Sequence, residues 1–393
     1  MGTARVLVVG GGIGGLALAV GLRERGLDVE VFERAASFGN TGSGIELTPN
    51  GVKSLDRISP WLGARVRETG WPSTRHRDSM PILSSDGRLL KSRDLAGFPD
   101  KWGAPLVGIL RAELHRLLVQ AVQRPGPGGS VTVHHNARVT AADCAGEAAS
   151  VRLADGRTVH GDVVVAADGV RSTLRTTVVP EARTRYLFTS VRGIAKRPAE
   201  HSDGFVLVGP AGHFFAEAVD ETRLFWTATV KAAEGSWPVK GAERAKADLL
   251  ELWGDWAQPL PDTVASTDPA DIVVTDVHDC APLARWHTGR LVLLGDAAHP
   301  IGPVLGQGAN MALEDAAFLS DALARARDIG TALRTYERAR SRRANKIVHH
   351  SRLIARLGHT TNPVAGWIRD LVIRSLKRRE ETYRDKQLFG YTP

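Results

Sequence analysis

Cysteine is scarce in this sequence and long apolar runs are absent, and both shortages narrow its class. The 393 residues include two cysteines, Cys144 and Cys280, which form neither a CxxC pair nor a metal-ligand spacing. We therefore expect a reducing, cytoplasmic setting and no metal site. No apolar stretch reaches the roughly 18 residues that a membrane-spanning helix needs. The chain also opens directly into a strand-like run, which disfavours a secretory signal.

The composition is that of a globular protein, with 43% hydrophobic and 24% charged residues. The net charge of +8 could indicate nucleic acid, but the basic residues are spread out, so we expect no nucleic-acid partner. Only the region from Trp367 to Arg379 is denser in them. We expect this region to be a capping helix on a cofactor-binding domain; the alternative is an amphipathic helix on a membrane surface.

A glycine-rich turn lies near the start of the chain between two strand-like segments. Arg5 to Val9 is an apolar run, and Gly10, Gly12 and Gly15 then form a G-x-G-x-x-G pattern ahead of a helical segment. Such a turn brings a dinucleotide pyrophosphate to a helix N-terminus. Glu33 ends the second strand, where an acid would bind the ribose. The alternative is a glycine turn with a purely structural role.

A second motif lies at the end of an apolar strand that begins at Asp162. The strand ends in Asp168-Gly169, and Arg171-Ser172 comes directly after. Taken alone, this segment is equally typical of a strand followed by a helix that Asp168 caps.

A third motif combines a buried strand with a glycine loop. Leu293 and Leu294 lead to Gly295-Asp296, which places an acid at the carboxyl end of a strand, where open α/β sheets bind ligands. The loop from Gly306 to Asn310 then precedes a helix from about Met311. That helix N-terminus could hold another electron-rich group.

The middle of the chain differs from both ends, because aromatic residues concentrate between about 180 and 280 in an alternating pattern. We predict an α/β protein: a Rossmann-like nucleotide-binding domain with an inserted, mainly antiparallel β-sheet substrate domain and C-terminal helices. The expected boundaries are 1–72, 102–179 and 281–360 for the nucleotide-binding domain, 73–101 and 180–280 for the substrate domain, and 361–393 for a C-terminal helical segment.

With its three motifs in this order, the chain resembles the single-component flavoprotein aromatic hydroxylases related to para-hydroxybenzoate and salicylate hydroxylases. The resemblance covers about residues 4 to 350 and implies bound FAD. It assigns the glycine turn and Glu33 to the ADP half of FAD, Asp168-Gly169 to the pyrophosphate, and Gly295-Asp296 to the ribityl chain. It assigns the later glycine loop to the isoalloxazine ring. The cofactor-binding residues that it implies are Gly10, Gly12, Ile13, Gly14, Glu33, Arg34, Glu46, Arg111, Val139, Asp168, Gly295, Asp296, Gly306, Gly308, Ala309 and Asn310.

The family reaction implied is an NADH- or NADPH-dependent monooxygenation. Reduced flavin reacts with O2 to give a flavin hydroperoxide, which hydroxylates or epoxidises a small aromatic or polycyclic substrate. A single dinucleotide fingerprint indicates that NAD(P)H binds transiently. The alternatives are an FAD-dependent reductase or dehydrogenase without oxygen insertion, and a non-catalytic protein that keeps a nucleotide fold. We expect a monomer or a homodimer.

The substrate is expected between the flavin and the aromatic-rich sheet, because flat apolar molecules suit aromatic walls. No catalytic acid or base can be assigned from the sequence. Each side chain proposed for this pocket could instead be an ordinary core or surface residue. The proposed substrate-binding residues are Arg192, His213, Phe215, Trp226 and Pro303.

Overall fold

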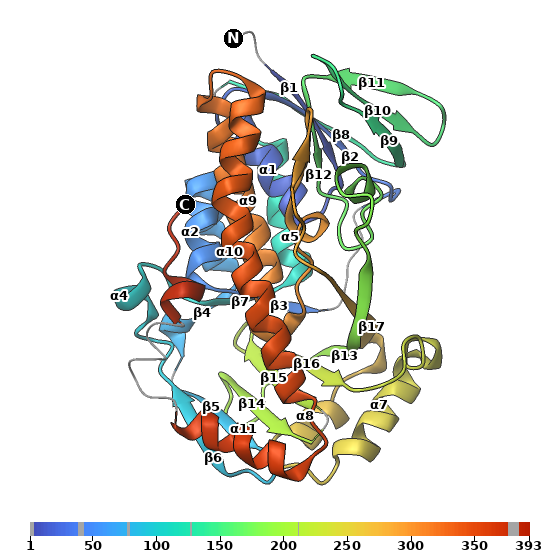
Figure 1. The fold of residues 1–393 in the computed structure, drawn as a ribbon. Helices are drawn as coiled ribbons and strands as arrows, with labels where there is room; N and C mark the ends of the chain where they lie inside the picture. The colour runs from blue at the N-terminus through green and yellow to red at the C-terminus, as the bar shows by residue number, and fades with distance from the viewer. Residues whose placement is uncertain (1–3, 38–42, 77–78, 126–127, 211, 376–384) are drawn as a thin grey trace.

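The fold has a parallel sheet at one end and a large antiparallel sheet at the other. The computed structural model describes residues 4–37, 43–76, 79–125, 128–210, 212–375 and 385–393. Figure 1 shows β1, β2, β8 and β12 near one end, β5, β6 and β13 to β16 towards the other, and the long helix α10 running between them. The predicted fold class, a Rossmann-like domain with an inserted β-sheet domain and C-terminal helices, is confirmed.

The first sheet has six strands in the order β18-β19-β12-β1-β2-β8. All its pairings are parallel except β18 with β19. The side chains of β1 from Val6 onward and of β12 are buried, as expected for a sheet covered on both faces. The strands are β1 (Arg5–Val9), β2 (Asp28–Phe32), β8 (Val131–His134), β12 (Val163–Ala166), β18 (His287–Thr288) and β19 (Leu291–Leu293).

Helices pack around this sheet through nearly continuous apolar surfaces. The helix α1 is buried along almost its whole length and lies against α9 and α5. The C-terminal helices are interrupted before Pro363, because α10 ends at Gly358 and α11 begins at Pro363. The helices are α1 (Ile13–Arg23), α2 (Pro49–Ile58), α3 (Pro60–Thr69), α4 (Phe98–Trp102), α5 (Arg111–Gln123), α6 (Arg175–Val178), α9 (Gly308–Arg325), α10 (Ile329–Gly358) and α11 (Pro363–Ser375).

The second sheet has seven strands in the order β17-β13-β16-β15-β14-β5-β6. Every pairing is antiparallel except β14 with β5. A second apolar core lies behind this sheet, under α7 (Gly241–Trp253) and α8 (Leu260–Ala265). The strands are β5 (Met80–Ser84), β6 (Leu89–Arg93), β13 (Thr184–Lys196), β14 (Gly204–Gly209), β15 (Gly212–Ala218), β16 (Arg223–Val230) and β17 (Val273–Cys280).

Two small sheets complete the fold. The sheet β3-β7-β4 lies against the large sheet, with β3 (Gly44–Leu47) beside β16 and β7 (Val107–Leu110) beside β15; β4 is Trp71–Pro72. We call the face of the large sheet that meets β3 and β7 the inner face. The other small sheet joins β9 (Val139–Asp143), β10 (Ala149–Leu153) and β11 (Thr158–Gly161).

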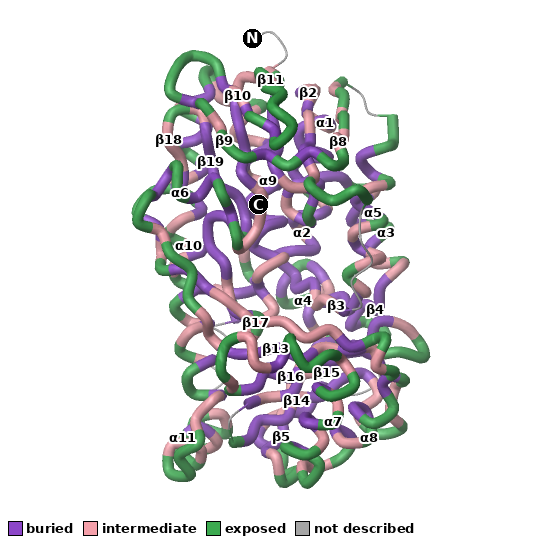
Figure 2. The backbone as a smooth tube through the Cα atoms, turned by 90° about the vertical axis from the view of Figure 1, so that its right-hand side faces the viewer, coloured by how far each residue is buried: buried purple, intermediate pink, exposed green. Residues whose placement is uncertain are grey.

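The helix α11 differs from the expected cap on the cofactor domain. It packs against β6 of the large sheet and the end of α10, and the Arg369 guanidinium donates to the Gly209 carbonyl at 2.8 Å. Its apolar side chains, such as Trp367 at 64% exposure, point outward, and Figure 2 shows its backbone largely exposed or half-buried. The expectation failed because the buried side of the helix is its charged side. In the described part of the chain, no helix is long and apolar enough to cross a membrane.

Candidate cofactor and substrate site

The three sequence motifs meet at one edge of the parallel sheet. The strands β1, β12 and β19 all end there, and the glycine turn follows β1 directly. Gly10 has a φ of +110°, and a Cβ on it would lie 2.4 Å from the Ala167 carbonyl oxygen. A Cβ on Gly15 would lie 2.0 Å from the Gly10 oxygen. Only glycine therefore allows the first motif to turn tightly against the second.

The N-terminus of α1 is left open to a ligand. A Cβ on Gly12 would meet nothing within 4 Å, and no side chain caps the helix. The free N–H groups and the positive end of the helix dipole suit a phosphate. Ile13 is buried, and a Cβ on Gly14 would meet Leu294, so both hold the helix against the core.

Glu33 is fixed beside this turn at the end of β2. Its two carboxylate oxygens accept hydrogen bonds from the Gly11 and Ala35 N–H groups, each at 2.8 Å. The side chain is half-buried, so one side of the carboxylate still faces solvent. The adjacent Arg34 is exposed.

The second motif is tied to the third by an arginine that the sequence analysis missed. Arg175 is buried, and its guanidinium donates to the carbonyls of Gly169, Asp296 and Ala297 at 3.3, 2.6 and 2.8 Å. Burial lowers the pKa of Arg175. The Asp168 carboxylate accepts from the Thr173 N–H at 2.9 Å in the turn before α6, so it is not the helix cap of the alternative, because Leu174 is the N-cap of α6 and no side chain caps it. Arg175 lies three residues after Ser172, and its bonds to Asp296 and Ala297 depend on a strand far away in the sequence.

Asp296 lies at the same edge of the sheet, just after β19. Solvent reaches its side chain, yet the surrounding protein desolvates the carboxyl and raises its pKa, against the charges of His299, Arg111 and Arg175. A Cβ on Gly308 would lie 3.9 Å from its carboxylate, so it faces the start of α9. The preceding residue, Gly295, has a φ of +60°.

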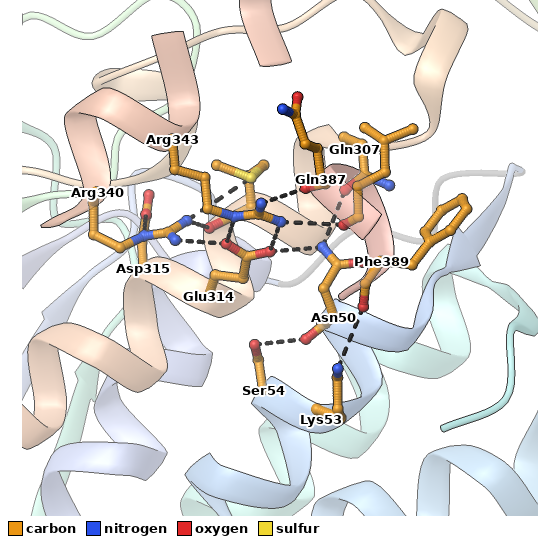
Figure 3. Close-up of polar contacts among 12 residues, drawn as sticks. Asn50, Lys53, Ser54, Gln307, Glu314, Asp315, Arg340, Arg343, Gln387 and Phe389 are labelled. Atoms are coloured by element: carbon orange, nitrogen blue, oxygen red, sulfur yellow. Dashed lines mark hydrogen bonds and ion pairs between the residues drawn. The ribbon is translucent and has the colours of Figure 1, made fainter. Parts of the chain in front are cut away.

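The loop 306–310 is anchored to the β3–α2 corner by buried amides. The Asn310 side chain accepts from the Thr48 N–H at 3.0 Å and donates to the Glu46 and Gly306 carbonyls at 2.9 and 2.7 Å. The Asn50 amide donates to Gln307 at 3.0 Å, as Figure 3 shows. Asn310 therefore shapes the loop through its side chain, and Gly306, Gly308 and Ala309 present mainly backbone.

Two further residues expected to bind the cofactor, Arg111 and Val139, differ in how far they are buried. Arg111 begins α5 and is exposed, and its charge acts on Asp296 and on Arg192. Val139 begins β9 and is buried at 7% exposure, so only its backbone is available to a ligand.

Three of the five predicted substrate residues share the inner face. Arg192 pairs with Thr227 across β13 and β16, and Thr227 pairs with Phe215 across β16 and β15. His213 lies two residues before Phe215 on the same side of β15. Phe215 stacks at a tilt on Phe225, with ring centroids 5.6 Å apart.

The other two predicted substrate residues are placed differently. Trp226 points away from the inner face, is fully buried in the second core and donates to the Thr267 hydroxyl at 2.9 Å. Pro303 is exposed in a short turn just before the loop 306–310.

Arg192 and His213 are half-buried polar groups with few partners. Arg192 donates to the Thr275 hydroxyl, but its Nε has no acceptor among the described residues. Burial and Arg111 lower the pKa of Arg192 to about 10. His213 bonds to the Thr229 hydroxyl at 2.8 Å and lies edge-on to His359. Burial and His359 lower the pKa of His213 to about 3, so its imidazole is neutral at ordinary pH.

These residues fit FAD. An uncapped helix beside an open glycine suits a pyrophosphate, and Asp168 Oδ1 is a buried acceptor with no partner among the described residues. The desolvated Asp296 carboxylate suits hydroxyl groups, and the 306–310 loop suits a flat ring edge.

The sequence and the fold are both similar to those of known FAD-dependent enzymes. Residues 3–351 match the FAD binding domain family. The chain is 33% identical, over 99% of its length and 98% of the relative, to aurachin C monooxygenase/isomerase of Stigmatella aurantiaca. It is 30% identical, over 88% of both chains, to an FAD-dependent urate hydroxylase of Klebsiella pneumoniae. The structure of Klebsiella pneumoniae HpxO with FAD and uric acid superposes with a TM-score of 0.88 at 27% identity, over 99% of this chain and 98% of that one.

The family match spans most of the chain, and both halves of the fold are present in the solved relative. The predicted cofactor and reaction type are thereby confirmed. The chain belongs to the FAD binding domain family and is an FAD-dependent monooxygenase.

Proposed function

We propose that this monooxygenase uses NAD(P)H and O2 to hydroxylate a flat, electron-rich aromatic or heteroaromatic molecule that carries a carboxylate, carbonyl or phenolate oxygen. The observation that carries the proposal is Arg192, a half-buried residue whose Nε is buried without a partner among the described residues, on the inner face that also carries Phe215. Arginine binds such oxygens through its planar N–H groups. Relatives named for aurachin C, 3-amino-4-hydroxybenzoate and urate are consistent with this class.

Each part of the site has a separate task. The α1 N-terminus and Gly12 would hold the pyrophosphate of FAD, Asp296 the ribityl hydroxyls, and the 306–310 loop the ring. Bound FAD would supply the chemistry of oxygen activation. Phe215 and Phe225 would hold the substrate plane and exclude water, and Arg192 would orient it by its oxygen.

The direct experiment measures substrate-dependent NAD(P)H oxidation by the purified holoprotein across phenolic, quinolone and purine-like compounds. Isotopically labelled O2 should appear in the product. If turnover continues without oxygen and no label is incorporated, the enzyme is a reductase or dehydrogenase and the proposal fails.

The cofactor assignment has its own test. Asp296→Ala should weaken FAD retention by about tenfold or more, because one charged hydrogen-bond partner contributes about 1.5–3 kcal/mol. Asp255→Ala, at an exposed position of the substrate domain, is the matched control. Unchanged flavin content in a folded Asp296→Ala protein would remove Asp296 from the site.

A further inference from the structure

Two glutamates meet where the sheet β3-β7-β4 packs on the inner face. Glu46 lies on β3 directly opposite Gly108 of β7, so its side chain points to the same side as a Cβ on Gly108 would. That Cβ would lie 3.3 Å from the carboxyl carbon of Glu217 on β15. The Glu46 side chain is therefore directed at the Glu217 carboxyl.

Glycines make this contact unusually close. A Cβ on Gly108 would lie 2.1 Å from the Ala218 carbonyl oxygen, and one on Gly44 would lie 2.1 Å from the Phe225 ring. No other residue type would let the two sheets approach so far. Backbone and an aromatic ring thus line the space between the two sheets at this pair.

Glu217 is the inaccessible member of the pair. Its side chain is 0% exposed, and neither carboxyl oxygen has a hydrogen-bond partner among the described residues. Its cross-strand neighbours, Gly204 and Phe225, carry no charge. A buried carboxyl without donors favours its protonated form.

Glu46 connects this buried acid to the cofactor loop. It is half-buried, and a Cβ on Gly306 would lie 3.3 Å from its Oε1. Burial raises its pKa to about 7, which Arg93 opposes. Burial, and then Glu46 itself, raise the pKa of Glu217 well above its usual value, again against Arg93. At neutral pH the pair therefore holds at least one proton.

We propose that Glu46 and Glu217 form a shared acid–base site that supplies a proton to the monooxygenase reaction. The proposal rests on the function proposed above. Hydroxylation of R–H by O2 and NAD(P)H forms R–OH, water and NAD(P)+ and consumes one H+ from outside the nicotinamide. The hydroxyl group of R–OH and the water molecule together hold three hydrogens. The nicotinamide supplies one of them, with two electrons, as hydride, and the substrate C–H supplies the second. The pair donates the remaining proton through Glu46 and recovers it from solvent by the same side chain.

The first test needs no turnover. Infrared spectra of the FAD-loaded protein at pH 6 should show a protonated carboxyl band that loses intensity in Glu217→Gln and in Glu46→Gln. The control Glu243→Gln, at an exposed position on α7, should keep the band. A wild-type protein without a protonated band at pH 6 would overturn the proposal.

The second test is kinetic. In Glu46→Gln, kcat per bound flavin should fall about 10²-fold, the scale of general acid catalysis, with KM unchanged; flavin content is measured separately, because Glu46 is also expected to lie at the cofactor. The loss of rate that the wild type shows as pH rises through about 7 should be absent. Glu217→Gln should show the same change, so the two variants check each other if either folds poorly.

Unchanged kcat with unchanged pH dependence would show a structural pair and overturn this inference. The monooxygenase function would still stand, because it is judged by label incorporation in the wild type. Absence of label in the wild type would instead remove the proposed function, whatever the infrared spectra show.

Discussion

Two buried polar regions of this molecule differ in how their charges are paired. Under α9, Arg340, Glu314 and Asp315 are all 0% exposed, and each charge has an opposite partner. The Arg340 Nε donates to Asp315 at 2.7 Å, and Arg343 adds a second guanidinium to Glu314, as Figure 3 shows. In this ionic network each buried charge is paired, although Arg340 Nη1 meets Glu314 as an ion pair without a hydrogen bond.

The inner face of the large sheet also carries buried polar atoms, but these have no hydrogen-bond partner in the part of the chain that the structure describes. Both Glu217 oxygens, Arg192 Nε and Ser190 Oγ have no partner among the described residues. Burial without partners costs stability, so the fold does not gain from these groups. The comparison contrasts paired charges under α9 with unpartnered polar atoms on the inner face, which are the atoms that the two proposals above assign to a ligand and to a proton.

The largest change in stability should come from the ionic network of Arg340, Glu314 and Asp315. Arg340→Met leaves Glu314 and Asp315 short of a buried partner and should lower the free energy of unfolding by about 3–5 kcal/mol. Chemical denaturation measures this loss. Arg338→Met, at an exposed position of the same helix, is the control and should change stability by about 0.5 kcal/mol or less. A small loss in Arg340→Met would mean that the network is not what stabilises this half.

Trp226→Phe tests whether a side chain on the outer side of the large sheet contributes to stability or to substrate binding. Trp226→Phe removes its hydrogen bond to Thr267 and leaves a small cavity, which should cost about 2 kcal/mol. The KM for substrate should stay unchanged because Trp226 points away from the inner face. A KM that rises without loss of stability would restore Trp226 as a substrate residue.

Substitution of Arg192 should change the substrate KM and leave the stability unchanged, which is the reverse of the result expected for Trp226. Arg192→Gln should raise the substrate KM about tenfold, equal to about 1.4 kcal/mol of binding, with stability unchanged or slightly higher. Steady-state kinetics and thermal unfolding together measure this. Lys196→Gln, an exposed neighbour on β13, should alter neither quantity. Destabilisation with normal KM would place Arg192 among the structural groups.

His213 offers a smaller effect that depends on pH. Its folded pKa of about 3 lies below the unfolded value near 6.5, so the unfolded chain binds the extra proton as pH falls. The wild type should therefore lose about 1.4 kcal/mol per pH unit from this group below about 6.5. His213→Gln should remove that part of the loss between pH 7.5 and 5.5. An identical pH dependence in both proteins would contradict the buried, neutral imidazole.

The cofactor half could be predicted closely from the sequence because its signals are local. The glycine turn, Glu33 and the strand end at Asp296 each follow their element within a few residues. The fold class follows from the same motifs. Arg175 was missed because its acceptors on Asp296 and Ala297 are brought near only by the sheet.

The substrate half could be predicted only in outline. Alternation shows that β15 and β16 have two faces, but it does not give the register between them. That register pairs Phe215 with Thr227 and Ala216 with Trp226, which sends Trp226 to the other core. Glu217 escaped notice for the same reason, since its partner lies on β3. The orientation of α11, with its apolar side chains outward, likewise follows from its packing on β6, which is far away in the sequence.

The strand order of the parallel sheet has a consequence for biosynthesis. β12 lies between β1 and β19, so segments 5–9, 163–166 and 291–293 must meet before the sheet is continuous. The Tyr391 ring then stacks over the guanidinium groups of Arg340 and Arg343. Such non-local pairing gives a high contact order and slow folding. On the ribosome, the glycine turn is made first but gains its last neighbours only when almost the whole chain has emerged.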